Sequence, residues 1–316
     1  MKVVSLGATD LRVSNICLGT MQFGWTADEA ASFAVMDAFV EAGGNFLDTA
    51  DVYSSWVPGH PGGEAEEVVG RWIKERRNRD RIVIATKARG KMWDGPDGEG
   101  LSRAHLLRAA EDSLRRLQVD TIDLYQCHWP DENKPIEETL RAFEELIAAG
   151  KVRYIGASNY WVPRLAEAQR AANAQLPRFV SLQPHYNLVH RDEYEGELEA
   201  FCASERLGVI PYSPLAGGFL TGKYRPDQEL PKTPRKQGAK AYMNEQGFRV
   251  IAALDAVAAA HGATVASVAL AWLLAKPTIT APIIGANTAE QLAGLLPAAD
   301  LALTADEVQQ LDEASS

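Results

Sequence analysis

The run Ile82-Val83-Ile84-Ala85-Thr86-Lys87 consists of four apolar residues followed by two polar ones. A short, continuously apolar segment is typical of a strand that is buried on both faces of a parallel sheet. Similar runs occur at seven other places in the chain: Ile16–Met21, Gly44–Thr49, Thr121–His128, Tyr154–Asn159, Phe179–Gln183, Gly208–Tyr212 and Thr280–Gly285. Eight such strands are the number that closes a (β/α)8 barrel of the TIM type.

Between these runs, the sequence has the spacing of amphipathic helices. In Glu64–Arg77, for example, Val68 and Trp72 fall on one apolar stripe. Thr26 and Glu29 match a capping box at the start of another helix. Further helices are predicted after Ser102 and Pro135, and over Pro163–Ala174, Glu193–Arg206, Gly247–Ala260, Thr264–Ala275, Thr288–Leu296 and Thr304–Ala314. This alternation predicts an α/β barrel with extra helices near the C-terminus.

The N-terminus is expected to form a β-hairpin outside the barrel. Lys2–Leu6 and Leu11–Ser14 are short β-rich segments on either side of the turn Gly7–Asp10. Gly222–Asn244 is the longest insertion, and we interpret it as a mobile loop rather than a linker between domains. Residues 1–316 are therefore predicted to form a single domain. Alternation alone also permits a doubly wound sheet, but no GxGxxG motif follows the first strand.

Composition argues against several classes of partner. The net charge is −10, whereas nucleic acids and anionic membrane surfaces attract basic proteins. No stretch approaches the roughly 20 apolar residues of a membrane span. The three cysteines, Cys17, Cys127 and Cys202, are scattered and lack the spacing of a metal site. We therefore expect a cytoplasmic protein without a metal, a nucleic-acid partner or a membrane contact, and the oligomeric state stays open.

Polar residues follow the predicted strands where the apolar runs stop. Asp48, Lys87 and His128 stand at three such ends, and Tyr53 lies in the loop beyond Asp48. In a TIM barrel these ends meet at one mouth, where the chemistry takes place. Each residue alone has a simpler explanation, such as a solvated lysine, a capping aspartate, a rim histidine or a surface tyrosine. Their coincidence at the same end of successive elements favours a site.

The four residues are suited to donate a proton to a developing alkoxide. A free tyrosine has a pKa of about 10, so Tyr53 needs help to act as an acid near neutral pH. The Lys87 ammonium is expected to lower that pKa, and Asp48 to keep Lys87 charged. His128 is expected to direct an N–H group at the substrate carbonyl. The sequence therefore predicts Tyr53 as the proton donor.

Longer motifs carry a family resemblance. They are GGNFLDTADVY at 43–53, TK at 86–87, DLYQCHWP at 123–130, GKVRYIGASN at 150–159, QPHYN at 183–187 and YSPLAGGFLTGKY at 212–224. Over nearly its whole length the chain resembles the aldo-keto reductases, and in detail the bacterial branch that is similar to potassium-channel β subunits. The resemblance implies NAD(P)H-dependent reduction of aldehydes or ketones, with Asp48, Tyr53, Lys87 and His128 as a catalytic tetrad.

The resemblance also implies a set of cofactor contacts. Ser158, Asn159 and Gln183 would hold the nicotinamide carboxamide, Tyr212 would stack on its ring, and the loop Ser213–Lys223 would wrap the pyrophosphate. The full set of implied contacts is Ser158, Asn159, Gln183, Tyr212, Ser213, Leu215, Gly217, Leu220, Lys223, Gly285, Asn287 and Gln291.

One of these positions departs from the family pattern. Asn287 stands where members that prefer NADPH usually have a basic residue, and only a basic residue could pair with the 2′-phosphate. Leu295 replaces a frequent asparagine in the same segment. By resemblance we expect NADPH as the first cofactor, with NADH possible and weak discrimination against it.

Aromatic residues near the predicted mouth suggest the substrate. Trp25, Trp93 and Trp129 are the expected substrate contacts, with further aromatic side chains at Trp56, Tyr160 and Trp161. Such a pocket suits aromatic aldehydes, α-dicarbonyls or the faces of sugars. Asp94–Gly100 and Gly222–Asn244 are predicted to be flaps that set specificity.

Two other functions remain open at this point. The chain could be a cofactor-binding regulatory subunit with residual reductase activity, like the channel-associated members. It could also be a Schiff-base aldolase that uses Lys87. Pairing with Asp48 would keep Lys87 protonated and poorly nucleophilic, which disfavours the aldolase.

Overall fold

A computed structural model describes residues 1–226 and 236–316 of the chain. Eight parallel strands form one sheet in the order β10-β3-β4-β5-β6-β7-β8-β9. Their bounds are β3 Cys17–Gly19, β4 Phe46–Asp48, β5 Val83–Ala88, β6 Ile122–Cys127, β7 Val152–Ser158, β8 Phe179–Gln183, β9 Gly208–Val209 and β10 Ile283–Ile284. Each strand overlaps one of the eight predicted runs, although β7 begins two residues earlier than expected.

The two ends of this sheet are joined by backbone hydrogen bonds. The amide of Thr280 donates to the carbonyl oxygen of Val209 over 2.8 Å, and Ile283 donates to Pro211 over 2.9 Å. Val209 also forms a parallel bridge with Ile279. The sheet therefore closes into the predicted (β/α)8 barrel. Because the strands follow one another in chain order, the structure has no reversal of the kind that defines a doubly wound sheet.

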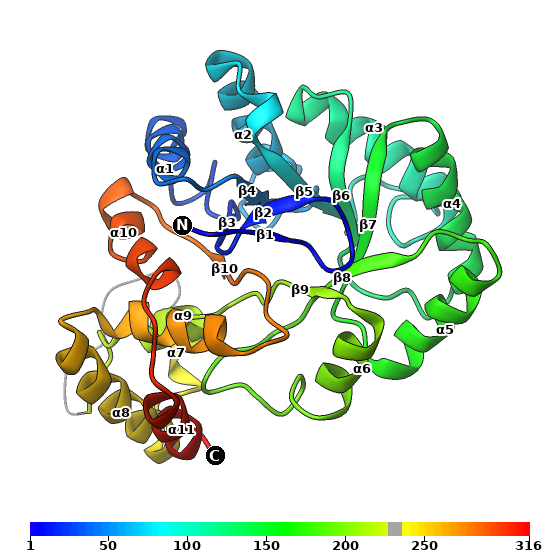
Figure 1. The fold of residues 1–316 in the computed structure, drawn as a ribbon. Helices are drawn as coiled ribbons and strands as arrows, with labels where there is room; N and C mark the ends of the chain where they lie inside the picture. Colours follow the sequence, from blue (N-terminus) through cyan, green and yellow to red (C-terminus); the bar gives the residue numbers. More distant parts are fainter. Residues whose placement is uncertain (227–235) are drawn as a thin grey trace.

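Helices surround the barrel, as Figure 1 shows. They are α1 Glu29–Glu41, α2 Glu64–Arg76, α3 Arg103–Leu117, α4 Ile136–Ala148, α5 Val162–Asn173, α6 Glu197–Glu205, α7 Lys236–Lys240, α8 Glu245–His261, α9 Val265–Ala275, α10 Ala289–Ala293 and α11 Ala305–Ala314. No single helix among those described has the length and apolar character to cross a membrane, and α8 with α9 qualifies only as a pair bent by 95°.

The predicted capping box at the first helix is wrong. Asp28 is the N-cap of α1, and its side chain accepts a hydrogen bond from the amide of Ala31. The Thr26 hydroxyl instead donates to Asn287 Oδ1 over 2.8 Å. Thr26 is thus drawn away from the helix by a residue that is remote in sequence, which local pattern cannot reveal.

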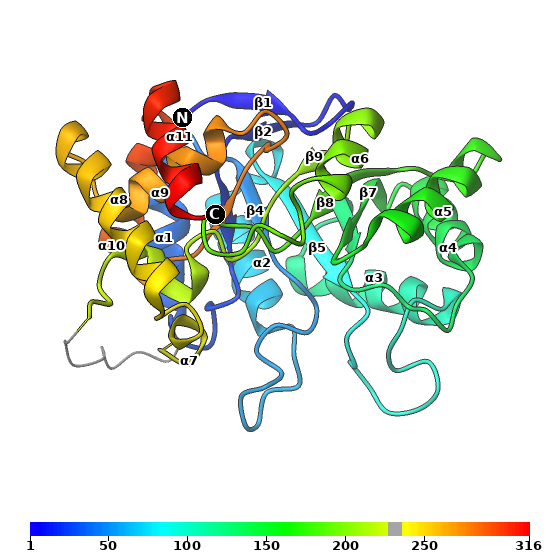
Figure 2. The ribbon, with the colours of Figure 1, turned by 90° about the horizontal axis from the view of Figure 1, so that it is seen from below.

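The N-terminal hairpin closes one end of the barrel. β1 (Val3–Ser5) and β2 (Arg12–Ser14) pair antiparallel, as expected. Leu6, Leu11 and Val13 belong to the same buried cluster as the side chains of the barrel interior. Figure 2 shows the hairpin at one end of the strands and long loops at the other. The end that carries the loops is therefore the open one.

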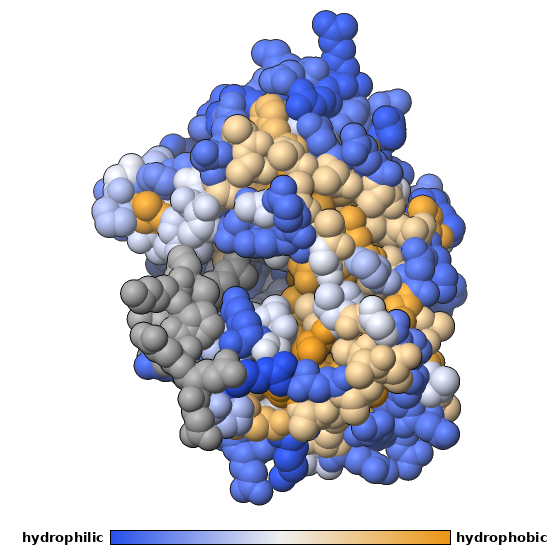
Figure 3. Space-filling model, turned by 90° about the vertical axis from the view of Figure 1, so that its left-hand side faces the viewer, coloured by the Kyte–Doolittle hydropathy of each residue, from blue (hydrophilic) through white to orange (hydrophobic). Residues whose placement is uncertain are grey.

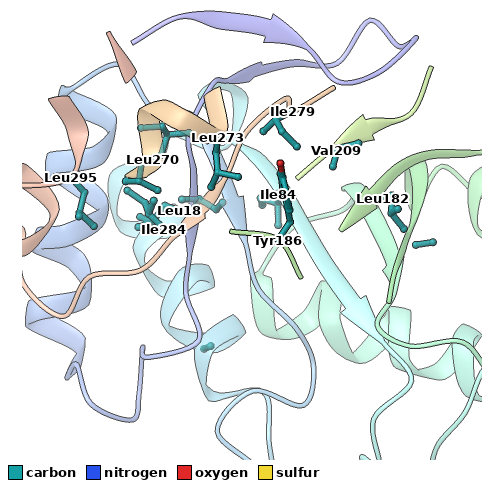
Figure 4. Close-up of a cluster of buried hydrophobic side chains, with 14 of the residues drawn as sticks. Leu18, Ile84, Leu182, Tyr186, Val209, Leu270, Leu273, Ile279, Ile284 and Leu295 are labelled. Carbon is teal, nitrogen blue, oxygen red and sulfur yellow. The ribbon is translucent and has the colours of Figure 1, made fainter. Parts of the chain in front are cut away.

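Alternation along the strands decides which side chains enter the barrel. Phe46, Ala85 and Leu124 lie in the interior cluster. Leu18 and Ile284 face outward, and Figure 4 shows them beside Leu270 and Leu273 of α9. Two residues beyond each interior residue come Asp48, Lys87 and Gln126. The same alternation thus places these polar groups inside the barrel at its open end.

The expected mobile loop Gly222–Asn244 is only partly described. Residues 227–235 lie outside the described residues. On either side of them the chain is structured, because Tyr224 is buried, Arg225 forms an ion pair with Asp255 and α7 is helical. Figure 3 shows the face that carries α1, α8 and α10, and the surface is hollowed near its centre.

Candidate active site

A cavity of about 1000 Å³ lies at the carboxyl ends of the strands. Asp48, Tyr53 and His128 line it, together with residues of the loop after β9 and the segment after β10. Its size is at the upper end of the usual range for ligand sites, which leaves room for a large ligand. The cavity therefore gathers the residues that the sequence predicted from the ends of separate strands.

Lys87 joins two members of the predicted tetrad. Its Nζ donates to Asp48 Oδ1 over 2.5 Å and to Tyr53 Oη over 2.9 Å. A third bond of 2.8 Å goes to the carbonyl oxygen of Thr49, so all three ammonium protons have acceptors. Burial opposes the charge, but the carboxylate of Asp48 and the contacts with Tyr53 outweigh it and raise the pKa of Lys87. A lysine held in the charged form is a poor Schiff-base nucleophile.

Asp48 is held in place by two glutamines. Gln126 Nε2 and Gln183 Nε2 donate to Asp48 Oδ2 over 3.0 and 2.9 Å. Asp48 is 1% exposed, so both of its carboxylate oxygens need partners within the protein. The two glutamines satisfy Oδ2, the oxygen that Lys87 does not contact. The sequence analysis missed the role of Gln126. Its position two residues after the interior Leu124 was the available signal.

The pKa of Tyr53 differs from the sequence expectation. Burial raises this pKa, and the positive charge of Lys87 lowers it by a smaller amount. The net result lies above the ordinary value of 10.0, so the expected net lowering is wrong in this structure. Tyr53 is consequently protonated at neutral pH, as a proton donor must be. Lys87 can still stabilise the phenolate once the proton has left.

His128 is the fourth member of the predicted tetrad. Burial, then Lys87 and Arg89, lowers the pKa of His128 well below its ordinary value. The imidazole is therefore neutral at physiological pH. Its ring stacks on Trp129 at 3.8 Å between centroids, and its carbonyl oxygen accepts a hydrogen bond from Asn159. The ring of Tyr53 lies 5.9 Å from that of His128, so both polar groups border the same space.

A hydrogen-bonded shelf lies beside the tetrad. Asn159 Nδ2 donates to Ser158 Oγ over 3.1 Å, and Ser158 Oγ donates to the carbonyl oxygen of Gln183 over 2.9 Å. Tyr212 Oη donates to Asn159 Oδ1 over 2.9 Å. Asn159 has φ = 59°, a conformation that asparagine tolerates better than most residues. The shelf is thus ordered by its own contacts.

Most of the implied cofactor contacts border the cavity. Those that line it are Ser158, Asn159, Gln183, Tyr212, Ser213, Leu215, Gly217, Lys223, Gly285, Asn287 and Gln291. Leu220 does not, because its side chain is buried in the hydrophobic core. Lys223 is the one lysine or arginine among the described lining residues. Sequence reasoning missed Gln22, Thr264 and Glu290, which carry no motif that would single them out.

These lining residues fit a nicotinamide dinucleotide. The shelf offers amide and hydroxyl groups next to the tetrad. Lys223 supplies a positive charge in the loop where Gly217 and Gly218 both have positive φ. Such glycine-rich backbone with a nearby cation suits a phosphate group. Among the described residues, no group of three or more His, Cys, Asp or Glu is placed to hold a metal ion.

The expected substrate contacts are only partly brought together. Trp25 and Trp129 line the cavity, and Trp56 joins them with its ring 5.4 Å from that of Trp25. Trp93 does not reach the cavity. Its ring stacks on His105 at 4.8 Å and lies under the Arg108 guanidinium at 4.1 Å. These two contacts of helix α3 hold Trp93 away from the mouth.

The remaining aromatic residues and the first predicted flap also lie outside. Tyr160 is buried and Trp161 is 41% exposed, and neither borders the cavity. None of residues 94–100 lines it.

Comparisons with known proteins show which family the chain belongs to. The chain is 38% identical to "Uncharacterized oxidoreductase YrpG" of Bacillus subtilis, over 99% of this chain and 95% of that protein. It is 34% identical to "Norsolorinic acid reductase A" of Aspergillus parasiticus, over 96% and 78%. It is 33% identical to "Probable voltage-gated potassium channel subunit beta" of Oryza sativa, over 95% and 92%. The pattern of the aldo/keto reductase family matches residues 15–316, and the chain belongs to that family.

Proposed function

We propose that this protein reduces an aldehyde or ketone to an alcohol with a reduced nicotinamide dinucleotide, and that Tyr53 is the general acid. The observation that carries the proposal is the position of Lys87, whose ammonium contacts both Asp48 and Tyr53 at the edge of a large cavity. Membership of an oxidoreductase family supports the reaction class.

The reduced cofactor would supply a hydride to the carbonyl carbon. Tyr53 gives its phenolic proton to the carbonyl oxygen as negative charge develops there. Lys87 stabilises the phenolate that remains, and Asp48 keeps Lys87 charged and fixed. An imidazole N–H of His128 donates a hydrogen bond to the same carbonyl oxygen and orients it. Asp48 and Lys87 are buried in the protein, and the low dielectric around them strengthens their electrostatic interaction.

The cofactor is assigned to the lining residues next to the tetrad. Ser158, Asn159 and Gln183 would bind the carboxamide, and Tyr212 would form the surface under the nicotinamide ring. Lys223 would pair with the pyrophosphate. NADPH is proposed first because the family resemblance implies it. The neutral Asn287 predicts that NADH is also accepted.

The substrate is proposed to be a carbonyl compound with a flat or aromatic body. Trp25, Trp56 and Trp129 provide aromatic faces at the mouth, and such faces favour stacking. A relative named as a norsolorinic acid reductase supports reduction as the direction of the reaction.

A second candidate is a regulatory subunit that binds the cofactor and turns over slowly. The similarity to a potassium channel subunit favours it. The test measures initial rates with a panel of aldehydes, α-dicarbonyls and ketones, with NADPH and NADH in parallel. Steady turnover that scales with enzyme supports the reductase. Tight cofactor binding without turnover of any panel member would favour the regulatory role.

A further inference from the structure

A column of three aromatic rings lies behind the cavity wall. The rings of Tyr212 and His185 are nearly parallel, at 11°, with their centroids 5.1 Å apart. His185 in turn stacks on His190 at 3.8 Å and 23°. Tyr212 lines the cavity, whereas the side chain of His190 is 25% exposed. The column therefore runs from the cavity wall to the protein surface.

Backbone contacts hold this column together. The amide of Tyr212 donates to the carbonyl oxygen of Pro184 over 2.9 Å, which sets His185 beside Tyr212. Asn187 and His190 exchange backbone hydrogen bonds of 3.2 and 3.0 Å, and this tight turn folds His190 back over His185. The main chain therefore brings the three residues together, and the orientation of the Tyr212 ring is left to the contacts of its side chain.

A side-chain hydrogen bond also joins the Asn187–His190 turn to the segment that carries Tyr212. Asn187 Nδ2 donates to the carbonyl oxygen of Ser213 over 2.9 Å. At the far edge of Tyr212, its hydroxyl donates to Asn159. Tyr212 is thus fixed at its edge by Asn159 and on one face by His185.

The chemistry of His185 suits a supporting ring. Burial and then the neighbouring His190 lower the pKa of His185 to about 4. At neutral pH the imidazole is therefore uncharged and presents a flat surface to Tyr212. At the outer end of the column, His190 Nε2 lies 3.2 Å from the carboxylate of the exposed Glu193.

We propose that His185, backed by His190, is a positioning residue for the nicotinamide end of the cofactor, because it holds the Tyr212 ring in the plane on which the nicotinamide stacks. This inference rests on the proposed function. It assigns a role to two histidines that contact neither the tetrad nor the cavity space. In this proposal His185 acts through the ring of Tyr212 and not by contact with the cofactor.

The test compares two ligands that differ at the nicotinamide end. NADPH carries the nicotinamide, whereas the corresponding 2′-phospho-ADP-ribose lacks it. Their dissociation constants are measured by calorimetry for the wild type, His185→Leu, which fills the space without a flat ring, and His185→Phe, which keeps one. His105→Leu is the matched control, because His105 also stacks on an aromatic ring but lies away from the cavity.

We expect His185→Leu to bind NADPH about tenfold more weakly and the ADP-ribose ligand within twofold of wild type. His185→Phe and His105→Leu should bind both ligands like the wild type. If His185→Leu does not fold, His190→Leu serves instead, with an expected two- to fivefold loss for NADPH alone.

Two results would overturn the inference. One is an equal loss for both ligands, which indicates a general structural role, and the other is unchanged NADPH binding. If the wild type binds neither ligand, the proposed function itself fails.

Discussion

Lys87 has the most unusual environment of any single residue in the site. It is fully buried, and its charge is stabilised by one carboxylate, one phenol and one carbonyl oxygen. An unpaired buried ammonium would be strongly unfavourable, so the lysine depends on Asp48. The two glutamines that hold Asp48 are therefore part of the same unit. At this scale, the central feature of the site is the Lys87 ammonium in contact with the Tyr53 hydroxyl.

The pKa shifts of His128 and Tyr53 predict a flat pH profile for reduction. The pKa of His128 is lowered, so the imidazole stays neutral above its ordinary value of 6.5. The pKa of Tyr53 is raised, so the phenol stays protonated up to at least its ordinary value of 10.0. The measurement is kcat/KM for carbonyl reduction across this interval. A rate that falls with a midpoint near pH 8 as the pH rises would show that the pKa of Tyr53 is lowered rather than raised.

Asn287 makes a prediction about cofactor choice. Asn287→Arg should increase the preference for NADPH over NADH by about tenfold, because a charge-assisted hydrogen bond to the 2′-phosphate contributes roughly 1.4 kcal/mol more than a neutral one. Fluorescence titration with both cofactors measures the ratio of dissociation constants. Asn287→Gln is the uncharged control and should leave the ratio unchanged. The prediction fails if the arginine variant keeps the wild-type ratio, or if the wild type already prefers NADPH by more than about a thousandfold.

At the scale of elements, the residue pattern predicted which strands and helices form, but not where every functional side chain lies. Alternation of side chains explains why Asp48 and Lys87 enter the barrel, so the strand-end argument succeeded for both. The separate expectation that aromatic residues gather at the mouth failed for Trp93, whose ring contacts His105 and Arg108 of α3 instead. The net pKa of Tyr53 was also beyond the sequence, because it depends on the depth of burial. Proximity in the chain carries no information about these contacts.

The start of helix α1 gives a test at this scale. Asp28→Ala should lower the free energy of unfolding by about 1 kcal/mol, because it removes the acceptor for the amide of Ala31. Thr26→Ala should have a smaller effect on stability, since Thr26 contacts Asn287 and not the helix. Urea unfolding followed by circular dichroism compares the two variants. A larger loss for Thr26→Ala would restore the capping box predicted from the sequence.

At the scale of the whole molecule, the barrel joins segments from both ends of the chain. β10 pairs with β3, so Gly285 and Asn287 line the same cavity as residues near positions 50 and 128. The count of apolar runs predicted this closure, because eight strands in chain order can form a barrel. The bounds of the shortest strands, β9 and β10, could not be predicted, because they depend on the hydrogen bonds between the segments containing these two strands, which close the barrel.

Global stability should depend on Asp51, which lies in the same loop as Tyr53. Asp51 is fully buried, and burial, followed by the charge of Glu66, raises its pKa well above the ordinary value of 3.8. Below pH 3.8 the Asp51 carboxyl is protonated in both the folded and the unfolded chain, so its burial costs no stability there. As the pH rises, the unfolded chain releases the proton first, so the folded state loses stability until the folded pKa is passed.

Asp51→Asn should remove this dependence on pH. We expect the variant to be more stable than the wild type by at least about 1 kcal/mol at pH 8, with the difference shrinking toward pH 4, because each unit of pKa shift corresponds to about 1.4 kcal/mol. Urea unfolding at a series of pH values measures the difference. A constant difference across the series would show that Asp51 does not titrate with a raised pKa.

The proton donor is tested most directly by Tyr53→Phe, which removes one hydroxyl and keeps the ring. The measurement pairs single-turnover reduction of a carbonyl that the wild type reduces with a cofactor titration of the same variant. The account predicts that the rate falls by about 10²–10⁴-fold, the usual contribution of general acid catalysis, while cofactor affinity stays within twofold of wild type. Reduction at the wild-type rate by the folded, cofactor-bound variant would contradict it.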